Sequence, residues 1–66
     1  MNVTVNGEPR ACQDGATLGE LLRGLGLEKS PIAVELNREV VPKGRHGETL
    51  LREGDRLEIV TLVGGG

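Results

Sequence analysis

One short amphipathic helix is the feature that most constrains the fold of this chain. The segment TLGELLRGLG starts at Thr17, and its leucines recur at helical spacing to form one apolar stripe: Leu18, Leu21, Leu22 and Leu25. Thr17 and Glu20 have the spacing of a capping box, which predicts that the helix begins there. Gly26 fits the left-handed position that ends a helix. Because a helix this short does not persist alone, its leucines must be buried against other elements.

The rest of the chain is predicted to form mainly strands. Alternation of apolar and polar residues predicts strands at about 2–5, 8–12, 32–36, 39–41 and 56–63. Asn6-Gly7 predicts a two-residue hairpin turn, because such a turn needs positive φ twice. Pro9 has no N–H to donate to a ladder, which places the second strand at an edge of the sheet.

The second half of the chain contains a second hairpin and a long connection. Asn37 tolerates the left-handed region and predicts a turn with Arg38, where a glycine would suit the turn better. The polar, glycine-rich segment 43–49 is expected to be a loop, and Leu50 and Leu51 to fold back as an anchor. The order is two strands, a helix, two strands and a final strand. It predicts an α+β domain over residues 1–63, a mixed sheet of about five strands with one helix on one face, followed by a tail at 64–66.

Composition excludes several functions. The net charge is −2 and there is no Phe, Tyr or Trp, which argues against binding nucleic acid. Apolar runs are far shorter than the ~20 residues that span a bilayer, so no membrane segment is expected. The first residues lack the layout of a signal peptide, and we expect a cytoplasmic protein.

Few residues could carry enzyme chemistry. His46 lies in KGRHGE, where a solvated loop histidine is expected, and with Cys12 alone it cannot complete a metal site. A reactive thiol is one interpretation of Cys12, but a free cysteine at the end of a strand favours a structural role. No glycine-rich loop for phosphate is present. We therefore expect no enzymatic activity and no bound cofactor.

The final strand presents two different faces. Alternation points Leu57, Ile59, Thr61 and Val63 towards the helix, and Arg56, Glu58, Val60 and Leu62 away from it. Val60 and Leu62 would form a small exposed apolar patch. Scattered surface hydrophobic residues are one interpretation. The other is a docking patch for a partner, which also involves Val63 and which the following glycines favour.

Several motifs together resemble one known family. They are NG at 6–7, TLGELL at 17–22, VELNREVVP at 34–42, EGDRLEIV at 53–60 and VGGG at 63–66. Over essentially the whole chain this order resembles the β-grasp, ubiquitin-like sulfur carrier proteins, most closely those of thiamine biosynthesis.

The resemblance implies a carrier whose working residue is Gly66. An E1-like adenylyltransferase would use ATP and magnesium to convert the Gly66 carboxylate into an acyl-adenylate. A cysteine desulfurase or another persulfide donor would supply sulfur, and thiazole synthase would receive it from the resulting thiocarboxylate. Gly64 and Gly65 suit a tail that threads a narrow channel, because glycine has no Cβ and accepts nearly any φ and ψ.

Besides a protein-conjugating modifier, which the sequence does not separate from a carrier, two alternatives remain open at this point. The first is a carrier similar to the small subunit of molybdopterin synthase, whose relatives are usually longer and have a proline-containing run before the final glycines. The second is a β-grasp interaction module in which the glycines have no chemical role.

Overall fold

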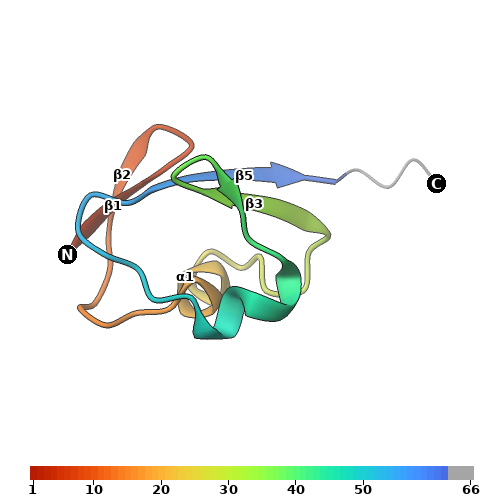
Figure 1. Cartoon of the computed structure of the whole chain (residues 1–66), viewed down its shortest axis with the longest axis horizontal. Helices are drawn as coiled ribbons and strands as arrows, with labels where there is room; N and C mark the ends of the chain where they lie inside the picture. The colour runs from red at the N-terminus through yellow and green to blue at the C-terminus, as the bar shows by residue number, and fades with distance from the viewer. Residues whose placement is uncertain (63–66) are drawn as a thin grey trace.

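The computed structural model describes residues 1–62. Two strands, β1 and β2, precede the helix, and two more strands, a short 3-10 helix and a last strand follow it (Figure 1). Their bounds are β1 Asn2–Val5, β2 Glu8–Ala11, α1 Leu18–Gly24, β3 Ile32–Leu36, β4 Glu39–Val40, η1 Lys43–Glu48 and β5 Arg56–Thr61. The predicted order of elements is confirmed. Strands β2, β4 and β5 are one or two residues shorter than predicted.

The five strands form one mixed sheet in the order β2-β1-β5-β3-β4. The central strand β5 runs parallel to its neighbour β1, with Thr4 opposite Arg56. The other neighbours are antiparallel, and Val34 of β3 lies opposite Ile59 of β5. β2 lies at an edge, which Pro9 requires. The sheet is the β-grasp arrangement that the sequence predicts.

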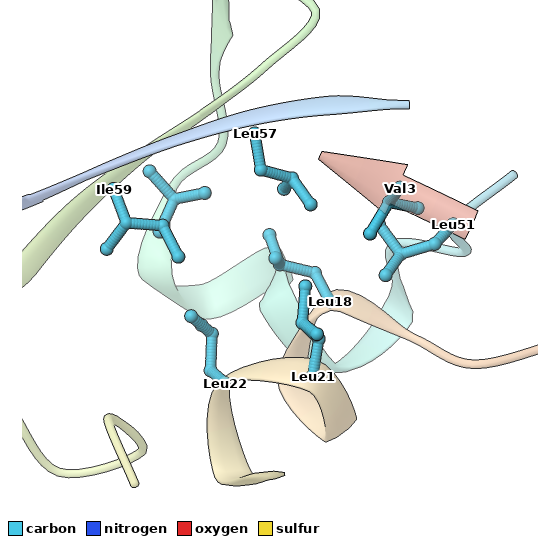
Figure 2. Packing of buried hydrophobic residues seen from close by; sticks show 8 residues of the cluster. Val3, Leu18, Leu21, Leu22, Leu51, Leu57 and Ile59 are labelled. Carbon is cyan, nitrogen blue, oxygen red and sulfur yellow. The ribbon is translucent and has the colours of Figure 1, made fainter. Parts of the chain in front are cut away.

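The helix covers one face of this sheet and its leucines make the core. Figure 2 shows leucines of α1 pointing up towards Leu57 and Ile59 of β5 and towards Val3 of β1. The buried core is Val3, Leu18, Leu21, Leu22, Val34, Leu51, Leu57 and Ile59. The apolar stripe is thus buried against the strands, as predicted.

Both ends of α1 have the predicted caps. Thr17 Oγ1 accepts a hydrogen bond from the backbone N–H of Glu20 at 3.1 Å, and Glu20 Oε1 accepts one from the N–H of Thr17 at 2.8 Å. These two bonds form the capping box. Gly26 follows the helix with a φ of 76°, a left-handed conformation in which a Cβ would be strained.

The two hairpin turns hold the last strand through their asparagines. Asn6 and Asn37 both have a φ of 51°. The carboxamide of Asn6 accepts from the N–H of Ile59 at 2.7 Å and donates to the carbonyl oxygen of the same residue at 3.1 Å. Asn37 Oδ1 accepts from the N–H of Arg56 at 3.0 Å, and its Nδ2 donates to Asp55. The carboxamide of Asn6 thereby adds two hydrogen bonds to β5 beyond the end of the short β1–β5 ladder.

Replacing Asn6 with glycine tests this contribution, because glycine adopts the positive φ readily and lacks the carboxamide. Two hydrogen bonds to β5 disappear, and we expect the free energy of unfolding to fall by about 1–3 kcal/mol. Urea unfolding followed by circular dichroism measures the loss. Asn6→Asp retains the acceptor for the N–H of Ile59 and should fall between the wild type and Asn6→Gly. An Asn6→Gly variant as stable as the wild type would show that the carboxamide does not hold β5.

The connection between β4 and β5 differs from the expected loop. Residues 43–48 form the 3-10 helix η1, which packs on α1. The packing is close at Gly19, where an added Cβ would lie 3.3 Å from the carbonyl oxygen of His46. The prediction that His46 is a solvated loop residue is wrong: it is half-buried, and its Nε2 lies 3.1 Å from the carbonyl oxygen of Val41. The expected anchor is confirmed for Leu51, whereas Leu50 is 62% exposed.

Candidate functional site

β5 is the central strand of the sheet, and its last residues remain hydrogen-bonded to a neighbouring strand. It pairs with β1 on one side and β3 on the other, and its last pair is Thr61 with Ile32. One residue later the N–H of Leu62 donates to the carbonyl oxygen of Pro31 at 2.7 Å. Figure 1 shows β5 ending at the opposite side of the molecule from the N-terminus. The pairing with β1 stops at Leu57, so the chain leaves the sheet alongside β3.

The described residues of the predicted docking patch are exposed. Val60 is 58% and Leu62 is 50% exposed. Leu62 lies one residue past β5, where it lines a small hollow on the helix side with Leu22, Leu27 and Ile32. Thr61 pairs with Ile32, which packs against the core, so Thr61 lies on the helix side as predicted, although it is exposed. Alternation therefore holds through Thr61 and places Val60 on the side away from the helix. The prediction that Leu62 also points away from the helix is wrong.

The remaining residues assigned to the site from the sequence are Val63, Gly64, Gly65 and Gly66. They lie outside the described residues. Their assignment stays a prediction.

The face of the sheet away from the helix carries a patterned set of exposed side chains. We call it the open face, and it comprises Arg56, Glu58 and Val60 of β5, Ala33 and Glu35 of β3, and Val40 of β4. Ala33 lies opposite Val60, and Glu35 lies opposite Glu58. Two like charges therefore face each other next to an apolar pair. The sequence alone does not reveal this pairing, because the pairing depends on the register between β3 and β5.

The half-buried cysteine lies away from the end of β5. Cys12 follows β2 and packs against the core, and it lines a shallow hollow with Arg10, Glu20 and Leu21. Within residues 1–62 no group of three or more His, Cys, Asp or Glu residues could hold a metal ion. Over the same residues, no helix is long and apolar enough to cross a membrane.

One ion pair ties the end of α1 to the loop that follows it. Arg23 Nε donates to Glu28 Oε2 at 2.8 Å. This hydrogen bond, with the attraction of the carboxylate, raises the pKa of the Arg23 guanidinium above its ordinary value. Both side chains are exposed, so the pair adds little to stability.

Comparison with known proteins identifies relatives over the whole chain. The model of the ThiS family matches residues 3–66. The sulfur carrier protein ThiS of Thermus thermophilus is 42% identical over 64 residues, which cover 97% of this chain and 98% of that protein. A thiazole synthase of Magnetococcus marinus is 44% identical over 66 residues, and this chain spans 20% of its length. The crystal structure of the thiamine biosynthesis protein ThiS from Geobacter metallireducens matches with a TM-score of 0.84 at 35% identity, with all of both chains covered.

Proposed function

Since the chain belongs to the ThiS family, we propose that it is a sulfur carrier protein of thiamine biosynthesis that carries sulfur as a thiocarboxylate on Gly66. The observation that carries this proposal is the end of β5. β1 pairs with the first two residues of β5, β3 pairs with it as far as Thr61, and the chain leaves the strand at Leu62, four residues before Gly66. The family match runs through residue 66. A fixed strand followed by side-chain-free residues suits a carboxylate that must enter another protein's active site.

The chemistry at Gly66 needs activation from outside the chain. An α-carboxyl group has a pKa near 3.5 and is ionised at neutral pH, which makes it a poor electrophile. An E1-like adenylyltransferase joins it to the AMP moiety of ATP, with magnesium, and releases pyrophosphate. A persulfide sulfur, from a cysteine desulfurase or a similar donor, then attacks the acyl carbon and AMP leaves. A thiol cleaves the S–S bond, is oxidised to a disulfide, and leaves the thiocarboxylate on Gly66.

In this proposal the chain is a co-substrate of its partners and not an enzyme. Its own residues provide the docking surface and the reactive terminus, and ATP and magnesium bind to the adenylating partner. Because ATP is consumed, the cytoplasm is the compartment that we propose.

Thiazole synthase is the acceptor that the relatives favour. Two proteins with that name, from Magnetococcus marinus and Paramagnetospirillum magneticum, contain a segment that matches all 66 residues of this chain. Joining a carrier and its acceptor in one polypeptide raises their effective concentration. This arrangement favours thiazole synthase, and not an enzyme of the molybdopterin pathway, as the protein that accepts the sulfur.

Incubation with an E1-like adenylyltransferase, ATP, magnesium and a persulfide donor tests the proposal. Mass spectrometry of the C-terminal fragment should show oxygen replaced by sulfur at Gly66. Oxidation of Met1 or Cys12 changes the intact mass almost equally, so the C-terminal fragment is the required readout. Cys12→Ser should react like the wild type, because Cys12 packs against the core. Sulfur found on Cys12 and absent from Gly66 would contradict the proposal.

A further inference from the structure

The turn between β1 and β2 places an asparagine directly before a glycine. Asn6 and Gly7 are both exposed to solvent. In this sequence the backbone nitrogen of the glycine can reach the side-chain carbonyl carbon of the asparagine, because glycine has no Cβ to obstruct the approach. Attack within one chain is also favoured by the high effective concentration of the reacting groups. The turn therefore has the arrangement that favours spontaneous deamidation.

Deamidation at this turn needs no reactant other than water. The Gly7 nitrogen loses its proton to solvent base and forms a bond to Cγ of Asn6. The bond from Cγ to Nδ2 breaks and ammonia leaves, which gives a cyclic imide that contains the Gly7 nitrogen. Water then opens the imide at either carbonyl carbon. The product is an aspartate, or an isoaspartate in which the backbone runs through the former side chain, and no atom is oxidised or reduced.

The fold holds the reactive carboxamide away from this path. Asn6 Oδ1 accepts a hydrogen bond from the N–H of Ile59 at 2.7 Å, and Nδ2, the nitrogen that leaves, donates to the carbonyl oxygen of Ile59 at 3.1 Å. The backbone N–H of Asn6 also donates to the carbonyl oxygen of Leu57 at 2.8 Å. Both carboxamide bonds must break before Cγ can turn towards the Gly7 nitrogen. Contact with β5 thus protects Asn6.

The turn between β3 and β4 provides an internal comparison. Asn37 has the same φ of 51° as Asn6. Its Oδ1 accepts from the N–H of Arg56 at 3.0 Å, and its Nδ2 donates to Asp55 Oδ1 at 3.0 Å. The residue that follows is Arg38, whose side chain hinders attack by its own backbone nitrogen. The two asparagines are held alike but differ in the next residue, and that difference selects Asn6.

We propose that Asn6 is a deamidation site whose rate is set by release of its carboxamide from β5. Each local opening of the turn exposes Cγ to the Gly7 nitrogen. Reaction makes the release permanent, because an aspartate has no N–H to donate to the carbonyl oxygen of Ile59. An isoaspartate adds a backbone atom to a turn that has positive φ at both Asn6 and Gly7. The reaction involves the carrier alone, so it is independent of the proposed function.

Parallel incubation of the folded protein and of the same protein unfolded in urea, at one pH and temperature, tests this assignment. Peptides are prepared at acidic pH, and fragmentation in the mass spectrometer assigns the modified residue. In urea, Asn6 should be largely converted while Asn2 and Asn37 are still intact. Folding should slow the conversion of Asn6 about 10-fold or more, the factor expected when an opening must break two hydrogen bonds. Equal rates at Asn6 and Asn37 in urea, or equal rates at Asn6 in both states, would overturn the inference.

Two glycine substitutions test which nitrogen attacks. Gly7→Ala adds a Cβ beside the attacking nitrogen and should slow deamidation of Asn6 in urea, where the positive φ of the turn no longer matters. Gly15→Ala is the matched control, since Gly15 has the same φ of 83° in another turn and an added Cβ meets nothing within 4 Å at either glycine. It should leave the rate at Asn6 unchanged. A Gly7→Ala variant that reacts as fast as the wild type would refute the role of the Gly7 nitrogen.

A urea series separates local release from global unfolding. Below the unfolding transition the rate at Asn6 should vary little with urea, because opening one turn exposes little surface. A rate proportional to the unfolded fraction would instead mean that release from β5 does not govern the reaction.

The deamidated protein itself provides a second readout. It carries an extra negative charge, so ion exchange separates it from the unreacted protein. Its Tm should be lower by roughly 4–8 °C, the shift expected when a chain of this length loses one hydrogen bond. An unchanged Tm would contradict the loss of the contact between Asn6 and Ile59.

Discussion

Deleting Gly66 should reduce thiocarboxylate formation by about 100-fold or more and leave the Tm unchanged. The shortened chain ends at Gly65, so its carboxylate lies one residue, about 3.5 Å of extended chain, short of its position in the full-length carrier. Adenylation and sulfur transfer need hydrogen-bond donors at about 3 Å from the developing oxyanion. A displacement of about 1 Å at the reacting atoms is enough to lower a rate about 100-fold. The rate is measured on the C-terminal fragment by mass spectrometry, with the adenylyltransferase, ATP and a persulfide donor.

A control variant and a competition measurement test whether the loss is specific to Gly66. Gly24→Ala changes an exposed glycine at the end of α1, where an added Cβ meets nothing within 4 Å, and this variant should transfer sulfur at the wild-type rate. The Gly66 deletion should still compete with the wild type for the adenylyltransferase, because the predicted docking residues Val60 and Leu62 are unchanged. A deletion variant that is activated and sulfurated as fast as the wild type would refute the assignment of Gly66.

Replacing Leu18 with alanine should destabilise the fold more than any change on its surface. Leu18 is fully buried, and Figure 2 shows it at the centre of the core, between the helix and the strands that carry Val3 and Leu57. Truncation of a buried leucine lowers the free energy of unfolding by about 3–5 kcal/mol, because apolar contacts are lost and a cavity remains. A chain of this length has roughly 3–10 kcal/mol in total. The Tm should therefore fall by roughly 12 °C or more, measured by thermal unfolding.

Leu50→Ala is the matched control for Leu18→Ala. The same side chain is truncated, but Leu50 is 62% exposed, so the free energy of unfolding should change by no more than about 0.5 kcal/mol. Comparable losses in the two variants would mean that Leu18 is not at the centre of the core.

Most of the fold follows from local patterns that can be recognised in the sequence. The leucine spacing and the Thr17–Glu20 capping box place α1, and Asn6-Gly7 places the first hairpin. The segment that forms η1 was missed, because KGRHGE has no apolar periodicity to indicate a helix. It is ordered by contact with α1 at Gly19, a residue 24 or more positions earlier in the chain. The half-burial of His46 has the same cause.

The candidate site was likewise only partly predictable from the sequence. The exposure of Val60 follows from alternation along β5, which sequence alone reveals. Leu62 departs from that alternation because β5 ends at Thr61. The pairing of Glu35 with Glu58 depends on the register between two strands that lie more than 20 residues apart, and no local pattern specifies that register.

The sequence by itself determined the order of the elements, the capped helix, the left-handed turns and the glycine-rich end, because these depend on backbone preferences and on spacings of a few residues. Only the tertiary structure decided which distant groups meet around β5. The carboxamides of Asn6 and Asn37 bond to its backbone, and Glu35 faces Glu58 across the sheet. The physical reason is that burying one whole face of the sheet selects the register. A slip of one residue would turn every buried side chain outward.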